Sequence, residues 1–337
     1  MTQTKNILEK LNSGFMKRGL NKLESELISE HLVRAELMGK RAHGIMKAFM
    51  MDDAISAREG KPEIIKDKHN YAKIDAHKEL GILSADFAVK VLLNKASKFD
   101  NAVVATINSY YYTIAGIYAK QIADAGYVGI VLNNGGPATI APYGGIDCLF
   151  GTNPVAIGIP YSKGSIVLDM TTGERPWSDV ILAKAENRKL EEGPFLDSQG
   201  KVTTDPSTVN AIIPFGGYKG AGLNFMFEIL TGAFVSAKMG LRSVDGYDLG
   251  FLFMAFSPEM FSTKERFDVE VGELVLQIKS SRKMKGVNEI FLPGESSERK
   301  YKKSMELGEV EVSQEILAKL EEFEAGENLK EKYSFKE

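Results

Sequence analysis

A glycine-rich segment, residues 216–222, contains the residues whose types and spacing best suit anion binding. It reads Gly-Gly-Tyr-Lys-Gly-Ala-Gly, with Gly217, Lys219 and Gly220 at its centre, and an apolar stretch follows it. Such a turn at the start of a helix exposes unpaired backbone N–H groups at the positive end of the helix dipole, where a lysine suits a phosphate. The spacing matches neither GxxxxGK[ST] nor GxGxxG, which disfavours nucleotide hydrolysis and a standard dinucleotide fold. Close packing of a helix through glycine explains the segment equally well.

His43 is the side chain best placed for proton transfer. It lies in the sequence Gly-Lys-Arg-Ala-His-Gly (39–44), with Lys40 and Lys47 nearby. We expect a helix to end here, with Gly44 in a left-handed turn. A histidine among cations suits an anionic substrate and acid–base catalysis. The alternative is a capping histidine that interacts with the helix dipole.

Two further candidates follow predicted strands. Asp169 ends an apolar strand, where a carboxylate can orient a base or a ribose, although it could equally start a turn with the threonines after it. Tyr110, Tyr111 and Tyr112 follow a strand that ends at Asn108. Successive side chains of an extended segment alternate in direction, so the three rings cannot share one side. At least one tyrosine is therefore expected to face a pocket, and core packing accounts for the other two.

The cysteine and histidine residues indicate neither a disulfide nor a metal site. Cys148 is the only cysteine and has no basic residue beside it, so we expect it to pack and not to act as a nucleophile. A single cysteine excludes an intrachain disulfide and fits a reducing compartment. The other histidines, with His43, show no metal-ligand spacing, so no bound metal is expected; they are His31, His69 and His77.

Composition narrows the class of protein. The chain has 337 residues, with 42 Lys and Arg against 45 Asp and Glu, giving a formal net charge of -3. This near-neutral balance does not produce the positive electrostatic potential that attracts nucleic acid. The N-terminus has no apolar signal core, and the apolar runs are far shorter than a bilayer span of roughly 20 residues. We therefore expect a soluble, cytoplasmic protein of about two domains, with neither nucleic acid nor membrane as a partner.

The pattern along the chain predicts an α/β protein. Helices are expected within the first 60 residues, with a cap near Ser25 and Glu26, and at 85–97, 115–125, 180–188, 223–239 and 313–325. Strands are expected at 101–108, 128–132, 155–159 and 165–170, and the alternation at 269–278 indicates another. Closely spaced Gly and Pro turns between 133 and 173 favour antiparallel pairing. The last twelve residues are charged and could be disordered.

Together these segments resemble the type-2 malate/L-lactate dehydrogenase family, which includes ureidoglycolate dehydrogenase, diketogulonate reductase, sulfolactate dehydrogenase and piperideine-carboxylate reductase. The resemblance runs from about residue 7 to about residue 323 and covers nearly the whole chain. Each segment is short, but their order and spacing together are specific. The segments are 35–44, 141–145, 151–154 with 159–160, 168–171, 204–206, 214–220 and 292–295.

The resemblance implies a sulfolactate-dehydrogenase-like α/β fold, not a Rossmann fold, with a mixed, largely antiparallel sheet buried between helices. On this basis residues 1–75 together with 265–337 form a helical, substrate-side domain, and 76–264 form an NAD(P)-binding domain that contains the sheet. It implies a homodimer that transfers hydride between NADH or NADPH and an anionic 2-oxo acid, a 2-hydroxy acid or a cyclic imino acid. The choice between NAD and NADP is left open, as is the substrate.

The resemblance also suggests roles for individual residues. His43 falls on the family's proton donor. The cofactor phosphates are expected at Gly217, Lys219 and Gly220. The nicotinamide end is expected at Asp169, Met170 and Thr171, and the same pocket is expected to include Asn134, Pro142 and Thr152.

Three departures from the family pattern fall near the expected substrate. Arg41-Ala42-His43-Gly44 stands where the family usually has Asp-Ser-His-Gly, so a hydroxyl beside the histidine is lost. Lys47 replaces an arginine and cannot form a bidentate carboxylate pair. Tyr111 stands where many members have a second histidine. We expect an active reductase with an unusual substrate, whose catalytic residues are His43, Tyr111, Lys47 and Asp169. The alternative is a catalytically impaired member that serves as a cofactor-binding or structural module.

Overall fold

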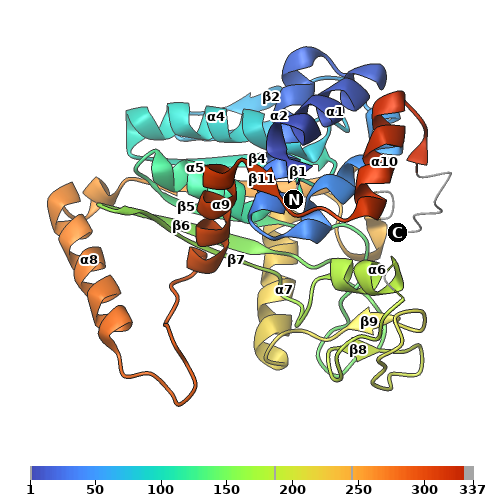
Figure 1. Ribbon diagram of the computed structural model, residues 1–337. Helices are drawn as coiled ribbons and strands as arrows, with labels where there is room; N and C mark the ends of the chain where they lie inside the picture. The colour runs from blue at the N-terminus through green and yellow to red at the C-terminus, as the bar shows by residue number, and fades with distance from the viewer. Residues whose placement is uncertain (1, 186, 244–245, 330–337) are drawn as a thin grey trace.

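A mixed seven-stranded sheet forms the centre of the computed structural model, which describes residues 2–185, 187–243 and 246–329 (Figure 1). The strand order is β2-β3-β4-β10-β5-β6-β7. Within the described residues β3 and β4 are parallel, and every other neighbouring pair in this sheet is antiparallel. The expected mixed, largely antiparallel sheet is confirmed. The strands are β2 (Glu63–Asp67), β3 (Tyr71–Asp75), β4 (Asn101–Ser109), β5 (Val128–Asn133), β6 (Val155–Tyr161), β7 (Gly164–Met170) and β10 (Leu249–Phe256).

Helices cover both faces of this sheet. On one face lie α4 (Gly81–Phe99) and α5 (Ala115–Asp124), and on the other lies α7 (Tyr218–Thr231), as Figure 1 shows. Side chains of the central strand β10 alternate between the two cores: Phe251 and Phe253 pack under α4 and α5, whereas Leu252 packs on the α7 side. This two-sided burial explains why β10 is a continuous apolar run.

The two ends of the described chain pack together beside the sheet. Helices α1 (Thr4–Lys17), α2 (Lys22–Leu37) and α10 (Gln314–Ala325) share one apolar core, in which the Phe15 and Phe323 rings meet edge-on with centroids 5.1 Å apart. The short strands β1 (Thr2–Gln3) and β11 (Glu309–Val310) pair antiparallel. The remaining short elements of this layer are η1 (Arg41–His43), η2 (Ile45–Met50) and α3 (Asp52–Ser56).

Two smaller groups complete the described fold. A separate core joins α6 (Trp177–Ala185) to the hairpin of β8 (Phe195–Leu196) and β9 (Ala211–Ile212). In Figure 1, α8 (Lys264–Ser280) stands away from the body, and a long loop returns from it to α9 (Glu295–Leu307). Two short helices lie between α7 and α8, namely η3 (Gly240–Arg242) and η4 (Pro258–Met260).

The predicted strand at 269–278 is wrong, because this segment belongs to helix α8. The side chain of Thr263 caps the helix by accepting a hydrogen bond from the N–H of Arg266. Apolar residues of α8 such as Val269 and Leu276 remain 58% and 63% exposed. With no buried face to impose a helical period, alternate apolar residues resembled a strand.

Three local predictions about helix ends are also wrong. The cap of α2 is Asn21, which forms a reciprocal capping box with Glu24, and not the Ser25–Glu26 pair. The left-handed glycine after α2 is Gly39, with φ of 76°, whereas Gly44 has φ of −93°. Helix α7 begins at Tyr218, directly after Gly217, and ends at Thr231, eight residues before the predicted end.

The two-domain division stays a prediction. Strands β2 and β3, which that division placed with the helical part, hydrogen-bond into the central sheet. Across the described residues no helix is both long and apolar enough to cross a bilayer. Most of the charged C-terminal tail lies outside the described residues.

Candidate active site

A cavity of about 870 Å³ opens between the sheet, the η1–η2 segment and α6. This volume falls in the range of small-molecule and cofactor sites. Seven of the residues predicted to be catalytic or to bind the cofactor line it together, although they lie far apart along the chain. They are His43, Lys47, Tyr111, Thr152, Asp169, Met170 and Thr171.

His43 is held in place by the short turn after α2. The N–H of His43 donates to the carbonyl of Lys40 at 2.9 Å. Behind it, the buried Glu36 carboxylate accepts a hydrogen bond from the N–H of Ile45 at 3.1 Å. A Cβ added at Gly44 would lie 2.1 Å from a Glu36 oxygen, so only glycine fits beside this carboxylate. Glu36 and Gly44 therefore fix the path of the segment that presents the imidazole.

The electrostatic environment keeps His43 neutral at pH 7. The pKa of His43 is lowered to about 4, mainly by burial and also by the positive charges of Lys47 and Lys40, whereas the backbone of Ala42 and the charge of Asp169 act in the opposite sense. Its Nδ1 is buried and has no hydrogen-bond partner among the described residues. An uncharged imidazole with an unused nitrogen can accept a proton from a ligand. A bound anion would raise its pKa by offsetting the lysine charges.

Lys47 and Tyr111 line the cavity side by side, and each has a polar group without a partner among the described residues. The Nζ of Lys47 lies 5.0 Å from the Tyr111 ring centroid, within cation–π range. Lys47 forms no ion pair with any residue that the structure describes, and the Tyr111 hydroxyl is buried without a partner there. Because a buried donor without an acceptor is costly, both groups are suited to a ligand that accepts hydrogen bonds.

The tyrosine segment is held from behind by the start of α4. A Cβ on Gly81 would lie 2.1 Å from the Tyr110 carbonyl oxygen, and the N–H of Tyr110 donates to the Glu79 carbonyl at 3.1 Å. All three tyrosines line the cavity, whereas the sequence required only one of them to face a pocket and assigned the other two to the core. Tyr112 is almost fully buried, and its hydroxyl donates to the side chain of Asn133.

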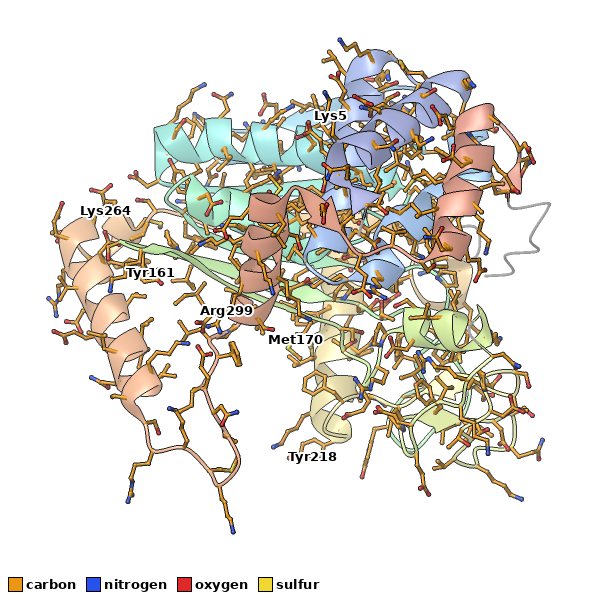
Figure 2. The ribbon with its side chains drawn as sticks, in the orientation of Figure 1. Lys5, Tyr161, Met170, Tyr218, Lys264 and Arg299 are labelled. Carbon is orange, nitrogen blue, oxygen red and sulfur yellow. The ribbon has the colours of Figure 1, made fainter. Side chains whose placement is uncertain are left out.

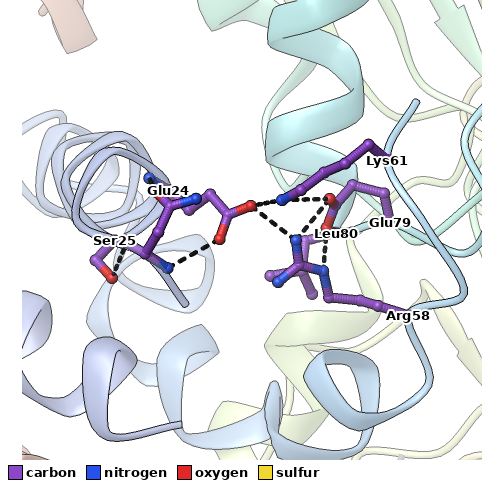
Figure 3. A network of polar contacts seen from close by, with 7 residues as sticks. Glu24, Ser25, Arg58, Lys61, Glu79 and Leu80 are labelled. Atoms are coloured by element: carbon purple, nitrogen blue, oxygen red, sulfur yellow. Dashed lines mark hydrogen bonds and ion pairs between the residues drawn. The ribbon is translucent and has the colours of Figure 1, made fainter. Parts of the chain in front are cut away.

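A buried ion network anchors this support (Figure 3). The Glu79 side chain is 1% exposed and accepts hydrogen bonds from Arg58 and from the N–H of Leu80, each at 2.8 Å. Arg58 also donates to Glu24 of α2 at 2.8 Å, and Lys61 pairs with the same carboxylate. The network therefore ties α2, which precedes the His43 segment, to the start of α4, which lies behind the Tyr111 segment.

Asp169 lies near the end of β7, where its carboxylate pairs with Lys40. A Cβ on Gly116 would lie 2.8 Å from the Cβ of Asp169, so α5 approaches β7 closely at this point. The adjacent Thr171 hydroxyl donates to the carbonyl of Thr152 at 3.0 Å. The predicted nicotinamide-side residues thus share one wall of the cavity.

Five predicted cofactor residues do not line this cavity. Lys219 is exposed near the start of α7, and Figure 2 shows its neighbour Tyr218 at the end of that helix away from the sheet. Gly220 packs on Phe215, where an added Cβ would lie 2.3 Å from the backbone oxygen. Asn134 is buried and uses its side chain to link the backbones of Lys238 and Gly250. The other two are Gly217, which precedes α7, and Pro142.

Some residues of the site were not singled out by the sequence. Glu36 looked like one more polar residue near a helix end, although burial raises its pKa to about 7. Trp177, the single tryptophan of the chain, lines the cavity from α6. Its position after a Gly- and Pro-containing turn was a weak signal. Cys148 donates to the carbonyl of Asn210, and burial raises the pKa of its thiol, which disfavours a reactive thiolate.

Among the residues that the structure describes, no cluster of His, Cys, Asp or Glu side chains could hold a metal ion.

The fold is that of known dehydrogenases. The solved structure of sulfolactate dehydrogenase from Methanocaldococcus jannaschii matches with a TM-score of 0.86 and 31% identity, covering 98% of each chain. The chain is 32% identical over 316 residues to the malate/(S)-sulfolactate dehydrogenase of Methanothermus fervidus, covering 90% of this chain and 91% of that one. It is 26% identical over 298 residues to the NAD(+) ureidoglycolate dehydrogenase of Escherichia coli, covering 85% of each.

The family model described as malate/L-lactate dehydrogenase matches residues 3–321. The chain belongs to this family, and it is accordingly an enzyme of the dehydrogenase and reductase class. The resemblance drawn from its sequence motifs is confirmed.

Proposed function

We propose that the protein transfers hydride between NADH or NADPH and a small anionic 2-oxo acid, 2-hydroxy acid or cyclic imino acid. The observation that carries this proposal is the meeting of three unsatisfied polar groups at one cavity: His43 Nδ1, the Tyr111 hydroxyl and the Lys47 ammonium. In dehydrogenase chemistry the bound dinucleotide supplies or accepts the hydride. The chain must then bind the acid group, orient the reacting carbon and move one proton.

Lys47 is the proposed partner of the substrate carboxylate. Its ammonium has no carboxylate partner among the described residues and stands beside the cavity-facing ring of Tyr111. The other lysine near His43, Lys40, is already paired with Asp169. A single lysine gives a strong point contact but less orientation than a bidentate arginine pair. Binding of a carboxylate here would also weaken the field that lowers the pKa of His43.

His43 is the proposed proton carrier. In the oxidation direction, neutral His43 would accept the proton of the substrate hydroxyl as a C=O bond forms at the carbon that carries this hydroxyl and loses its hydride. In reduction, protonated His43 returns that proton to the carbonyl oxygen or the imine nitrogen. The Tyr111 hydroxyl is proposed to donate a hydrogen bond to the same atom, because a tyrosine remains neutral at pH 7 and has one proton to offer.

The cavity suits a dinucleotide in size and in the residues that line it. Met170, Thr171 and Thr152 would line the nicotinamide end, with the Trp177 ring on another side. Lys219 is proposed to bind the phosphates from outside this cavity, at the start of α7. The comparisons offer no support for a non-catalytic module.

We also propose that the protein forms a homodimer, because two of its helices expose large apolar side chains. Helices α7 and α8 expose large apolar side chains, including Phe225, Met226, Leu274 and Leu276, each between 50% and 63% exposed. Exposed apolar side chains of this size are typical of protein interfaces. Sedimentation velocity should give a dimer mass, and a monomer at micromolar concentration would contradict this part of the proposal.

The proposed reaction is tested by measuring NADH and NADPH oxidation over a panel of 2-oxo acids and cyclic imino acids. At least one acid should be reduced with saturation kinetics, and its amide or ester, which lacks the negative charge, should be a much poorer substrate. Absence of turnover with every acid, in a protein shown to bind the cofactor, would contradict the proposal.

A further inference from the structure

The segment that carries Tyr111 is bounded at both ends by residues with left-handed backbone. Asn108 has φ of 55° and Thr113 has φ of 70°. Asparagine adopts this conformation readily, and its side-chain nitrogen donates to both carboxylate oxygens of Asp75 at 3.1 Å. A β-branched threonine at positive φ is a genuine outlier, because its side chain crowds the backbone. Neighbouring groups must therefore hold Thr113 in this conformation.

The turn at Thr113 is a tight one. The N–H of Ile114 donates to the carbonyl of Tyr112 at 3.0 Å, so a hydrogen bond closes three residues with Thr113 at the centre. With a positive φ at the central residue, this is the rare and strained form of the γ-turn. Tyr112 and Thr113 also line the catalytic cavity, directly after Tyr111. Strained turns of this kind cluster at functional sites, where they fix the direction of a side chain.

The side chain of His31, on α2, holds this turn from behind. Its Nε2 lies 2.7 Å from the Oγ1 of Thr113 and forms a hydrogen bond with it. The imidazole is 7% exposed and stacks on the ring of Tyr118, with ring centroids 5.5 Å apart. Because the stacked ring has little freedom to rotate, the hydrogen bond fixes the Thr113 hydroxyl and with it the turn.

His31 is uncharged at pH 7. Its pKa is lowered to about 3, mainly by burial and also by the charges of Arg34 and His43, whereas a hydrogen bond with the backbone of Tyr112 acts in the opposite sense. The ring can therefore hold the turn without adding a positive charge beside the imidazole of His43.

Helix α2 thus supports both side chains that are assigned to the substrate. Near its end, the carboxylate of Glu36 accepts a hydrogen bond from the N–H of Ile45 at 3.1 Å, which fixes the His43 segment. Earlier in the same helix, His31 fixes the turn that follows Tyr111. The hydroxyl of Tyr111 has no partner among the described residues, so its direction depends on the backbone that carries it.

We propose that His31 and Thr113 are positioning residues that orient Tyr111 relative to His43. The inference rests on the proposed function, in which the Tyr111 hydroxyl donates to the reacting atom of the substrate. Such a donor must be held within about 0.5 Å of its productive position. Loss of the hydrogen bond between His31 and Thr113 lets the turn relax and the Tyr111 ring move. A purely structural contact would instead affect unfolding and leave the turnover of folded protein unchanged.

Thr113→Gly separates these two roles, because glycine adopts a φ of 70° without strain but has no hydroxyl. Thermal unfolding should stay close to that of the unmodified protein, and the cofactor Kd should not change. Turnover should fall by about two-fold to ten-fold, the effect of losing one hydrogen bond to the substrate. Thr113→Ser keeps the hydroxyl and should recover most of the rate. Ser236→Gly, which relieves a φ of 67° outside the cavity, is the matched control and should leave kcat unchanged.

Tyr111→Phe provides the background that tests whether the two residues act through Tyr111. His31→Phe keeps an aromatic ring beside Tyr118 but has no nitrogen, and it should slow turnover as Thr113→Gly does. In protein that already carries Tyr111→Phe, either change should slow turnover by less than about two-fold, whereas independent effects would multiply. Multiplied losses would overturn the proposal, as would unchanged turnover in folded Thr113→Gly.

Amide hydrogen exchange tests the contact between His31 and Thr113 without any substrate. Peptides that cover residues 110–115 should exchange about two-fold to ten-fold faster in Thr113→Gly and His31→Phe, and at the unmodified rate in Ser236→Gly. Unchanged exchange in both variants would overturn the proposal. Faster exchange, combined with no reduction of any acid by the unmodified protein, would contradict the proposed function and the positioning role that rests on it, while establishing the contact itself.

Discussion

The ammonium of Lys47 lies 5.0 Å from the ring centroid of Tyr111, and both side chains face the same cavity as His43. The resemblance drawn from the sequence motifs implies an arginine at the first of these positions and, in many members, a histidine at the second. The substitutions therefore come as a contacting pair and not as two unrelated changes. A lysine and a phenol together offer one charge and one neutral donor, which is the basis of the proposed preference for a small acid.

Tyr111→Phe is expected to reduce turnover by about two-fold to ten-fold, because one hydrogen bond worth about 0.5–1.5 kcal/mol is lost. Tyr111→His should shift preference towards ordinary 2-oxo acids. Both variants are assayed on the same panel of acids, with Tyr110→Phe as a matched control. If neither the rate nor the rank order of substrates changes, Tyr111 does not contact the substrate.

Lys47→Met should lower kcat/KM for the acid by about ten-fold to one hundred-fold, since it keeps the length of the side chain but removes the charge. It should also shift the pH profile. His43 must be neutral to accept a proton, so kcat/KM for oxidation falls as the pH drops through about 4. Removing Lys47 relieves a repulsion that lowers the pKa of His43, so this limb should move to higher pH. An unmoved limb would place Lys47 away from the imidazole.

Lys219→Ala should weaken dinucleotide binding by about ten-fold to one hundred-fold without altering thermal unfolding. The reason is loss of a charge-assisted hydrogen bond to phosphate at the start of α7. Lys184→Ala, on α6, serves as a control for the loss of one lysine. Cofactor binding is followed by quenching of Trp177, and an unchanged Kd would move the phosphates elsewhere.

Glu36 should make the stability of the protein depend on pH. Its pKa is raised from 4.5 to about 7 by burial, so the folded state holds a proton that the unfolded state releases. Its contribution to stability is fully present below pH 4.5 and is lost as the pH rises through about 7, by up to about 3 kcal/mol. Glu36→Gln should remove this loss. Denaturant unfolding at pH 5 and pH 8 measures it, and parallel behaviour of both proteins would refute the assignment.

Much of the site could be predicted from the sequence because the family motifs contain, or stand next to, the residues that line the cavity. His43, Tyr111 and the 169–171 segment line one cavity as a consequence of the sheet order, which no local pattern contains. Glu36 could not be singled out, because a carboxylate near a helix end looks solvated until the following turn folds over it. Helix α8 was mistaken for a strand because its apolar residues stay exposed in this chain. Lys219 lies outside the main cavity because the first turn of α7, to which it belongs, is at the end of the helix away from the sheet.

The central claim is that His43 carries the proton, and single-turnover kinetics of His43→Ala test it most directly. The variant is mixed with bound NADH or NADPH and an acid that the unmodified protein reduces, and hydride transfer is followed by loss of dihydronicotinamide absorbance. The rate should fall by about 10²–10⁴-fold, the usual contribution of acid catalysis, while the cofactor Kd from Trp177 quenching stays nearly unchanged. A hydride-transfer rate like that of the unmodified protein would contradict the account and assign the proton to another group.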